Sequence, residues 1–192
     1  MRTFAAWTKE NMQALRAEPG DVAADRIGDA VLEVDLRLGV EIANEEEGQP
    51  RELIVTAFSN AELFPLVRQI VQRMSSIPGW QIVPLKPPRG FEFTITLGPY
   101  SIQAQKLSFA FIPGMHKGIR LIAAAEVVQA MRDRNAAEEL AWLTVETGIG
   151  EELTGTLEHV EFAVAESDQQ THLISELRSY LSGIHESGNS DS

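Results

Sequence analysis

The chain of 192 residues contains no cysteine, carries a formal net charge of −12, and is 44% hydrophobic and 23% charged. This composition is ordinary for a soluble globular protein, and the length suits one compact domain or two small repeated halves, either of which can bury a real core. The lack of cysteine excludes disulfides, a thiol nucleophile and thiolate metal ligands, and the acidic balance argues against nucleic-acid binding through phosphates.

The start of the chain and its apolar runs predict a cytoplasmic protein. Residues 1–13 (MRTFAAWTKENMQ) lack the apolar core and small-residue cleavage site of a secretory signal. The longest apolar runs, such as LIAAA at 121–125, are too short to span a bilayer. We therefore expect no membrane partner.

Charge is distributed unevenly along the chain. Residues 51–134 carry 10 basic and 5 acidic side chains, whereas residues 151–192 carry nine acidic side chains and only Arg178 as a basic one. The acidic ends could pair with the basic middle within one fold, or with the middle of a second copy in a symmetric homodimer.

Two short amphipathic helices are predicted at the N-terminus. Apolar residues fall close to one stripe in residues 3–16, and Pro19-Gly20 ends this helix. Asp21 is a candidate N-cap for a second helix that reaches about Val31.

A β-hairpin is predicted next. In VDLRLGVEI (34–42), apolar residues including Val34 and Leu36 alternate with Asp, Arg, Gly and Glu, which indicates a strand with one buried face. EEEGQP (45–50) is the turn, and RELIVTAF (51–58) is the returning strand.

A helix and an edge strand complete the first half. Asn60 can cap a helix that runs to about Met74, with Pro65 in its first turn. Trp80 begins the strand, and Pro84 confines that strand to an edge or a bulge. The first half is therefore β-β-α-β.

The second half begins after a predicted linker, KPPRG (86–90). FEFTITL (91–97) alternates as a strand that Gly98-Pro99 ends, and LSFAFI (107–112) and IRLIAAA (119–125) form a second hairpin.

A helical region, a strand and a last helix follow. The helical region falls in two pieces, the second opened by a capping box of Asn135 and Glu138 and ending near residue 150. EHVEFAV (158–164) is a strand. The apolar residues of the final amphipathic helix are Leu173, Ile174, Leu177, Leu181 and Ile184.

These elements predict an α+β fold. Two β-β-α-β-like halves, residues 34–85 and 91–165, would form antiparallel-rich sheets with helices mainly on one face, plus N- and C-terminal helices. We expect a single compact domain, 1–185, and a disordered tail, 186–192.

Three short segments carry a resemblance to a known family. NAELFPLV (60–67), PGWQIVPLKP (78–87) and GIGEEL (148–153) occur in this order after the first hairpin. Over residues 30–165 the chain resembles an uncharacterised bacterial family of cytoplasmic α+β proteins, a domain of unknown function. The resemblance implies the fold and implies no activity or functional residue.

The Gly148-Ile149-Gly150 motif could suggest a phosphate loop. A phosphate loop follows a strand and opens a helix, whereas this motif is predicted to end one. Glycine just past a helix end tolerates a positive φ, so we predict a C-cap.

Histidine and carboxylates cluster just after this motif. His159 and Glu161 share one face of the predicted strand, and Glu151 and Glu152 precede them. A catalytic metal usually takes three protein ligands, so the pattern favours a solvent-facing polar strand, and no metal or cofactor is predicted.

Basic residues in the middle of the chain are candidate anion ligands. If the linker and the second hairpin converge, they could hold a phosphate or a carboxylate; they could equally pair with the acidic ends. These residues are Lys86, Arg89, Lys106, Lys117 and Arg120.

A group of apolar residues around the linker is a candidate partner surface. Trp80, Pro84, Pro87 and Phe91 could form an exposed ledge for another protein, or the aromatic rings could simply be core residues.

The leading hypothesis is a non-enzymatic protein-interaction or regulatory module that binds another protein through a sheet edge or through the Trp80–Phe91 region. The alternative is a small-molecule or anion-binding protein, or an enzyme, that uses the basic middle and nearby carboxylates. No serine lies in a Gly-x-Ser-x-Gly elbow, which leaves the enzyme without a recognisable nucleophile.

Overall fold

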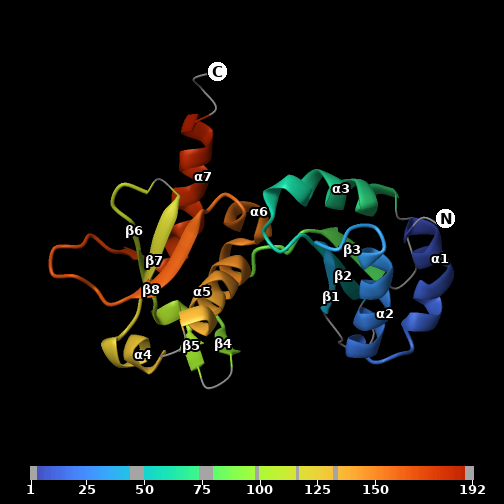
Figure 1. Cartoon of the computed structure of the whole chain (residues 1–192), viewed down its shortest axis with the longest axis horizontal. Helices are drawn as coiled ribbons and strands as arrows, with labels where there is room; N and C mark the ends of the chain where they lie inside the picture. The colour runs from blue at the N-terminus through green and yellow to red at the C-terminus, as the bar shows by residue number, and fades with distance from the viewer. Residues whose placement is uncertain are drawn as a thin grey trace. The chain divides into compact units, whose positions relative to one another are not determined.

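The structure is a computed structural model that describes residues 4–43, 50–73, 80–97, 100–115, 117–131 and 134–188. The fold is α+β, as predicted (Figure 1). The chain divides into two compact units, Met1–Lys86 and Pro87–Ser192, and the boundary falls in the segment expected to be a linker. Each unit has its own hydrophobic core.

Unit 1 contains a three-stranded sheet and three helices. Strand order is β1-β2-β3, with β1 antiparallel and β3 parallel to β2, so α3 is the crossover of a parallel β-α-β unit. The predicted β-β-α-β order is confirmed. The elements are α1 (Phe4–Leu15), α2 (Gly20–Leu32), β1 (Gly39–Ala43), β2 (Arg51–Thr56), a 3-10 turn (Ala61–Leu63), α3 (Phe64–Arg73) and β3 (Trp80–Pro84).

The helices of unit 1 pack on one face of its sheet. Leu53 and Val55 of β2, which share that face, are fully buried in one cluster with residues of all three helices. Arg51 also links the sheet to α1, because its guanidinium donates to the carbonyls of Leu15, at 3.3 Å, and Glu18, at 2.7 Å. A cation at these carbonyls complements the negative end of the helix dipole.

The strand predicted at 34–42 is wrong in its first half. β1 begins at Gly39, and Val34 and Leu36 are 44% and 83% exposed instead of buried. Asp35 Oδ1 accepts hydrogen bonds from the Arg37 backbone N–H at 2.9 Å and from Arg37 Nε at 3.1 Å. This local turn competes with the strand for the backbone, which alternation of residue types does not reveal. Residues 44–49 of the predicted turn lie outside the described residues.

The predicted helix starts in unit 1 are partly confirmed. Asn60 Oδ1 accepts from the Glu62 N–H at 3.2 Å, as expected of an N-cap. α2 begins at Gly20, so Asp21 lies inside the helix instead of capping it. The predicted helix end at Met74 lies outside the described residues.

Unit 2 contains two sheets. A two-stranded sheet, β4-β5, is antiparallel, and a four-stranded sheet has the order β8-β7-β6-β9. The elements of unit 2 are β4 (Thr94–Leu97), β5 (Tyr100–Gln103), β6 (Ser108–Phe111), β7 (Gly118–Ile122), α4 (Ala125–Ala130), α5 (Arg134–Ile149), α6 (Glu151–Thr154), β8 (His159–Ala163), β9 (His172–Leu173) and α7 (Leu177–Gly188). There are also 3-10 turns at Ala104–Lys106 and Ile174–Glu176.

The order β6-β7-α5-β8 repeats the order β1-β2-α3-β3. In both units a hairpin is followed by a helical crossover and a strand parallel to the second strand of the hairpin. Phe109, Leu121 and Val160 are fully buried on one face of the four-stranded sheet, in a cluster that includes residues of α5 and α7. Arg120 and Glu161, next to them in sequence, therefore lie on the opposite face.

Four further predictions in unit 2 differ from the structure at element boundaries. The strand expected at 91–97 begins at Thr94, and α5 begins at Arg134, so Asn135 is not its N-cap. Leu173 belongs to β9 and is 64% exposed, instead of lying on the helix. Helix α7 continues to Gly188, so the predicted tail is helical at 186–188, and 189–192 lie outside the described residues. Gly98-Pro99 also lies outside them.

Candidate functional site

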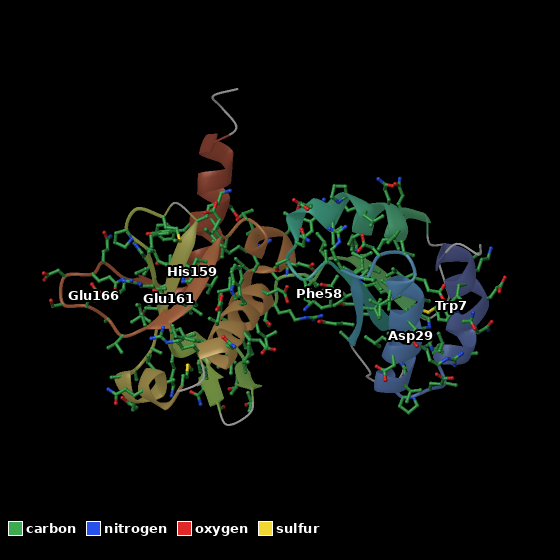
Figure 2. All side chains as sticks on the ribbon, in the orientation of Figure 1. Trp7, Asp29, Phe58, His159, Glu161 and Glu166 are labelled. Carbon is green, nitrogen blue, oxygen red and sulfur yellow. The ribbon has the colours of Figure 1, made fainter. Side chains whose placement is uncertain are left out.

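Four side chains of unit 2 form an ionic network across β7 and β8. Arg120 Nε donates to Glu161 Oε1 at 2.7 Å, and Arg120 Nη1 donates to Glu166 Oε1 at 3.2 Å. His159 Nε2 lies 3.4 Å from Glu161 Oε2. Figure 2 shows Glu166 on the loop that follows β8, apart from His159 and Glu161. We refer to these four residues as the β7–β8 polar cluster.

The network keeps Glu161 and Arg120 charged. Burial by itself raises the pKa of Glu161, but hydrogen bonds from Arg120 and His159 lower it, and the result is a pKa below the ordinary value. The hydrogen bond to Glu161 raises the pKa of Arg120, against a smaller opposing effect of burial. Arg120 is therefore a cation that already has two carboxylate partners, which leaves little attraction for an added anion.

A cavity of about 540 Å3 lies beside the polar cluster. One wall consists of the consecutive β8 residues 159–162, and α4 and the start of α5 form the other. We call this cavity the β8 groove; the residues of its helical wall are Val128, Met131, Arg134, Ala137 and Glu138.

The β8 groove lies along a free strand edge. Consecutive strand residues point to opposite faces of a sheet, so a cavity that contacts four of them in a row must run along the edge of the strand. Among the described strands, β8 is indeed the outer strand of its sheet and pairs only with β7.

Backbone hydrogen bonds identify the groups at this edge that do not pair with β7. The His159 N–H donates to the Lys117 carbonyl at 3.4 Å, and the Ala163 carbonyl accepts from the Ala123 N–H at 3.0 Å. In a parallel pair every second residue directs both backbone groups to its neighbour, so the N–H and C=O groups of Val160 and Phe162 point away from β7. In the described part of the chain no other backbone group bonds to them.

A second cavity, of about 430 Å3, is lined by Arg120. Its lining combines Phe111, Pro113 and His172 with polar residues 166–170 of the loop after β8. His172 is held in place, because its Nδ1 lies 2.9 Å from the Tyr180 hydroxyl.

The four candidate partner residues around the linker do not form an exposed ledge. Trp80 is 7% exposed in the core of unit 1, and Phe91 is 7% exposed in the core of unit 2. Pro84 is exposed and Pro87 half-buried. The aromatic rings are core residues, which was the alternative interpretation.

The five candidate anion ligands are distributed over both units. Lys86 belongs to unit 1, where its Nζ lies 2.6 Å from Glu41 Oε1. In unit 2, Lys117 lies 3.7 Å from Glu158 and Arg120 pairs within the polar cluster. Lys106 and Arg89 are exposed. The ion pairs match the alternative that the basic middle pairs with carboxylates.

The acidic candidates separate into two places. His159 and Glu161 share the polar face of β8, as predicted, and join the polar cluster. Glu151 and Glu152 lie in α6, where Glu151 is fully buried and Glu152 is exposed. Among the described residues, no group of three metal-ligating side chains occurs.

Sequence reasoning missed most of the groove. The helical wall was not identified, because nothing in the sequence says that α4 and α5 reach the edge of β8. Glu166 was also missed, and its only signal was the density of acidic residues after position 150.

Comparison of the chain with family models, curated proteins and solved structures found no match. The resemblance to an uncharacterised bacterial family therefore stays a prediction. No helix of the described residues is both long and apolar enough to cross a membrane.

Proposed function

We propose that this protein is a non-enzymatic interaction module that binds an extended segment of another protein at the free edge of β8. The segment would add to the sheet as a further strand, with its backbone paired to Val160 and Phe162. Strand addition to an exposed sheet edge is a common mode of peptide recognition.

The observation that carries this proposal is the coincidence of a cavity with unpaired strand backbone. A groove of about 540 Å3 runs along residues 159–162 of the outer strand. Buried or half-buried backbone groups without partners are costly, so a strand that supplies them gains hydrogen bonds in addition to apolar contacts.

Two other outer strands in the described residues, β3 and β9, are less suited to strand addition. β3 ends in Pro84, which has no N–H to donate, and β9 contains only two residues. β8 has five residues, and none of them is proline.

A small-molecule site is the second candidate function. The second cavity, about 430 Å3, falls in the size range of ligand pockets. Its cation, Arg120, already pairs with two glutamates, so the cavity favours a neutral or cationic molecule over the anion that the sequence suggested.

A substitution that fills the β8 groove with a larger side chain tests the proposed function. Ala137 lines the groove on α5, whereas its neighbour Ala136 does not, although both are half-buried. We would select linear peptides of about ten residues, the upper end of usual strand lengths, from a random display library on the full chain. We expect selected peptides to lose at least about tenfold in affinity, ~1.4 kcal/mol, with Ala137→Phe and to keep it with Ala136→Phe.

Amide hydrogen exchange then reports the binding mode. Bound peptide should slow exchange at the amides of Val160 and Phe162, because strand addition gives them acceptors. Peptides that bind Ala137→Phe as well as the wild type, or that leave both amides unchanged, would contradict the proposal.

A further inference from the structure

The β8 groove has two chemically different sides, which restricts the sequence of a bound strand. A strand added at the edge continues the sheet, so its side chains alternate between the two faces. One set would lie on the face of Val160 and Phe162, and the other on the face of His159 and Glu161. The two sets meet different surroundings, and the inference below rests on the proposed function.

The face of Val160 and Phe162 is apolar. Val160 is fully buried in the core of unit 2, and Phe162 packs against that core. The helical wall adds Val128, Met131 and Ala137 beside them, and two residues of opposite charge, Arg134 and Glu138. Side chains of a bound strand that point to this face would leave water for carbon-lined surroundings, which favours residues such as valine, isoleucine and leucine.

The opposite face carries excess negative charge. Two carboxylates, those of Glu161 and Glu166, pair with one cation, Arg120, so one negative charge remains when histidine is counted as neutral. Glu158 keeps 66% of its side chain exposed and lies 3.7 Å from Lys117, a loose pair that a new cation can join.

The charge of the surrounding chain has the same sign. Residues 151–192, which include β8 and the loop after it, carry nine acidic side chains and one basic one. This field attracts cationic segments and repels acidic ones before contact is made.

We infer that the β8 groove binds an extended protein segment in which apolar residues alternate with lysine or arginine. The apolar residues pack between β8 and the α4–α5 wall, and the basic residues lie on the face of Glu161. A segment with the same apolar residues and glutamate at the alternate positions is rejected by charge.

Four synthetic peptides test this inference on the full chain. The first alternates valine with lysine, and the second alternates valine with glutamate. The third has the composition of the first but groups its valines and lysines in separate blocks. The fourth is the first peptide with methylated backbone nitrogens on the side that would pair with β8.

We expect the valine–lysine peptide to bind at least about tenfold more tightly than each of the other three. The preference over the glutamate peptide should shrink at high salt and in the double variant Glu158→Gln, Glu161→Gln. Both changes weaken the electrostatic attraction between the peptide lysines and the protein. Glu176→Gln, an exposed carboxylate outside the groove, is the matched control and should keep the preference.

The outcomes separate the two proposals. Equal binding of the lysine and glutamate peptides would overturn the inference and leave strand addition standing. If the block peptide bound as tightly as the alternating valine–lysine peptide, the affinity would come from unspecific charge attraction, and the inference would be overturned. Equal binding of the methylated peptide would overturn strand addition itself, and absence of binding in the whole series would overturn both. The peptide comparison on the wild type remains decisive if the double variant does not fold.

Discussion

At the scale of single residues, the two glycines of the Gly-Ile-Gly motif have different physical roles. Gly150 follows the last residue of α5 with φ of 87°, and its N–H bonds to the Glu146 carbonyl at 2.9 Å, as the predicted C-cap requires. A Cβ added at Gly148 would lie 2.1 Å from the Phe91 ring. Gly148 therefore serves close packing, which the motif itself does not reveal.

Gly148→Ala should destabilise unit 2. The Phe91 ring is buried and has little room to shift, so we expect a loss of about 1–3 kcal/mol in the free energy of unfolding, measured by urea denaturation. Gly183→Ala in α7 is the control, because no heavy atom lies within 4 Å of its Cβ, and it should be neutral or stabilise by up to ~1 kcal/mol. Equal effects of the two substitutions would show that the contact with Phe91 does not limit position 148.

At the scale of elements, local side-chain bonding decides where β1 begins. Asp35 bonds to the backbone and side chain of Arg37 and closes a turn. Of the alternating segment that predicted a strand from residue 34, only the part from Gly39 onward therefore forms β1. Apolar alternation gives the correct face of a strand, but a turn-forming aspartate overrides it locally.

The Asp35 turn should be visible in a titration. Hydrogen bonds from Arg37 lower the pKa of Asp35 from 3.8 to about 2. Because the folded pKa is depressed, the stabilisation is present above the unfolded pKa and is lost as pH falls from about 4 towards 2. NMR of the carboxyl carbon should give a midpoint near 2 in the wild type and a higher one in Arg37→Ala, which still falls below the ordinary value because the backbone N–H of residue 37 remains as a donor.

A matched variant supports this measurement. Arg26→Ala removes a different arginine, on α2, whose salt-bridge partner is Glu18, and should leave the Asp35 midpoint unchanged. A wild-type midpoint close to 4 would mean that the turn does not persist in solution.

Other element errors have a common cause. β9 was not predicted, because a strand of two residues carries no periodicity, and β5, which follows the predicted strand end at Gly98-Pro99, was also missed. β9 exists only because β6 offers an edge next to it, with Phe109 opposite His172. Long elements with repeated apolar positions, such as α3 and the hairpin β6–β7, were predicted within a few residues.

At the scale of the whole molecule, the chain has two cores. All buried core residues of the first lie between Met12 and Leu85, and all those of the second between Phe91 and Leu181. The boundary between the units follows Lys86, inside the segment KPPRG that composition marked as a linker.

Residues 1–86 and 87–192 should each fold as separate fragments. Each unit buries its apolar residues in a core made only of its own elements, so each should show a cooperative thermal transition and dispersed NMR spectra. The intact chain is the reference. A fragment without a cooperative transition would show that its core depends on the other half of the chain.

The sequence by itself determined the α+β class, the hairpin-helix-strand order of both halves, the linker and the polar face of β8. Each of these follows from local periodicity and turn chemistry. Only the tertiary structure decided that Trp80 and Phe91 are buried in separate cores, and that β8 is an outer strand with a groove between its edge and helices α4 and α5. Strand order and helix placement depend on contacts between residues far apart in the chain, which periodicity does not encode.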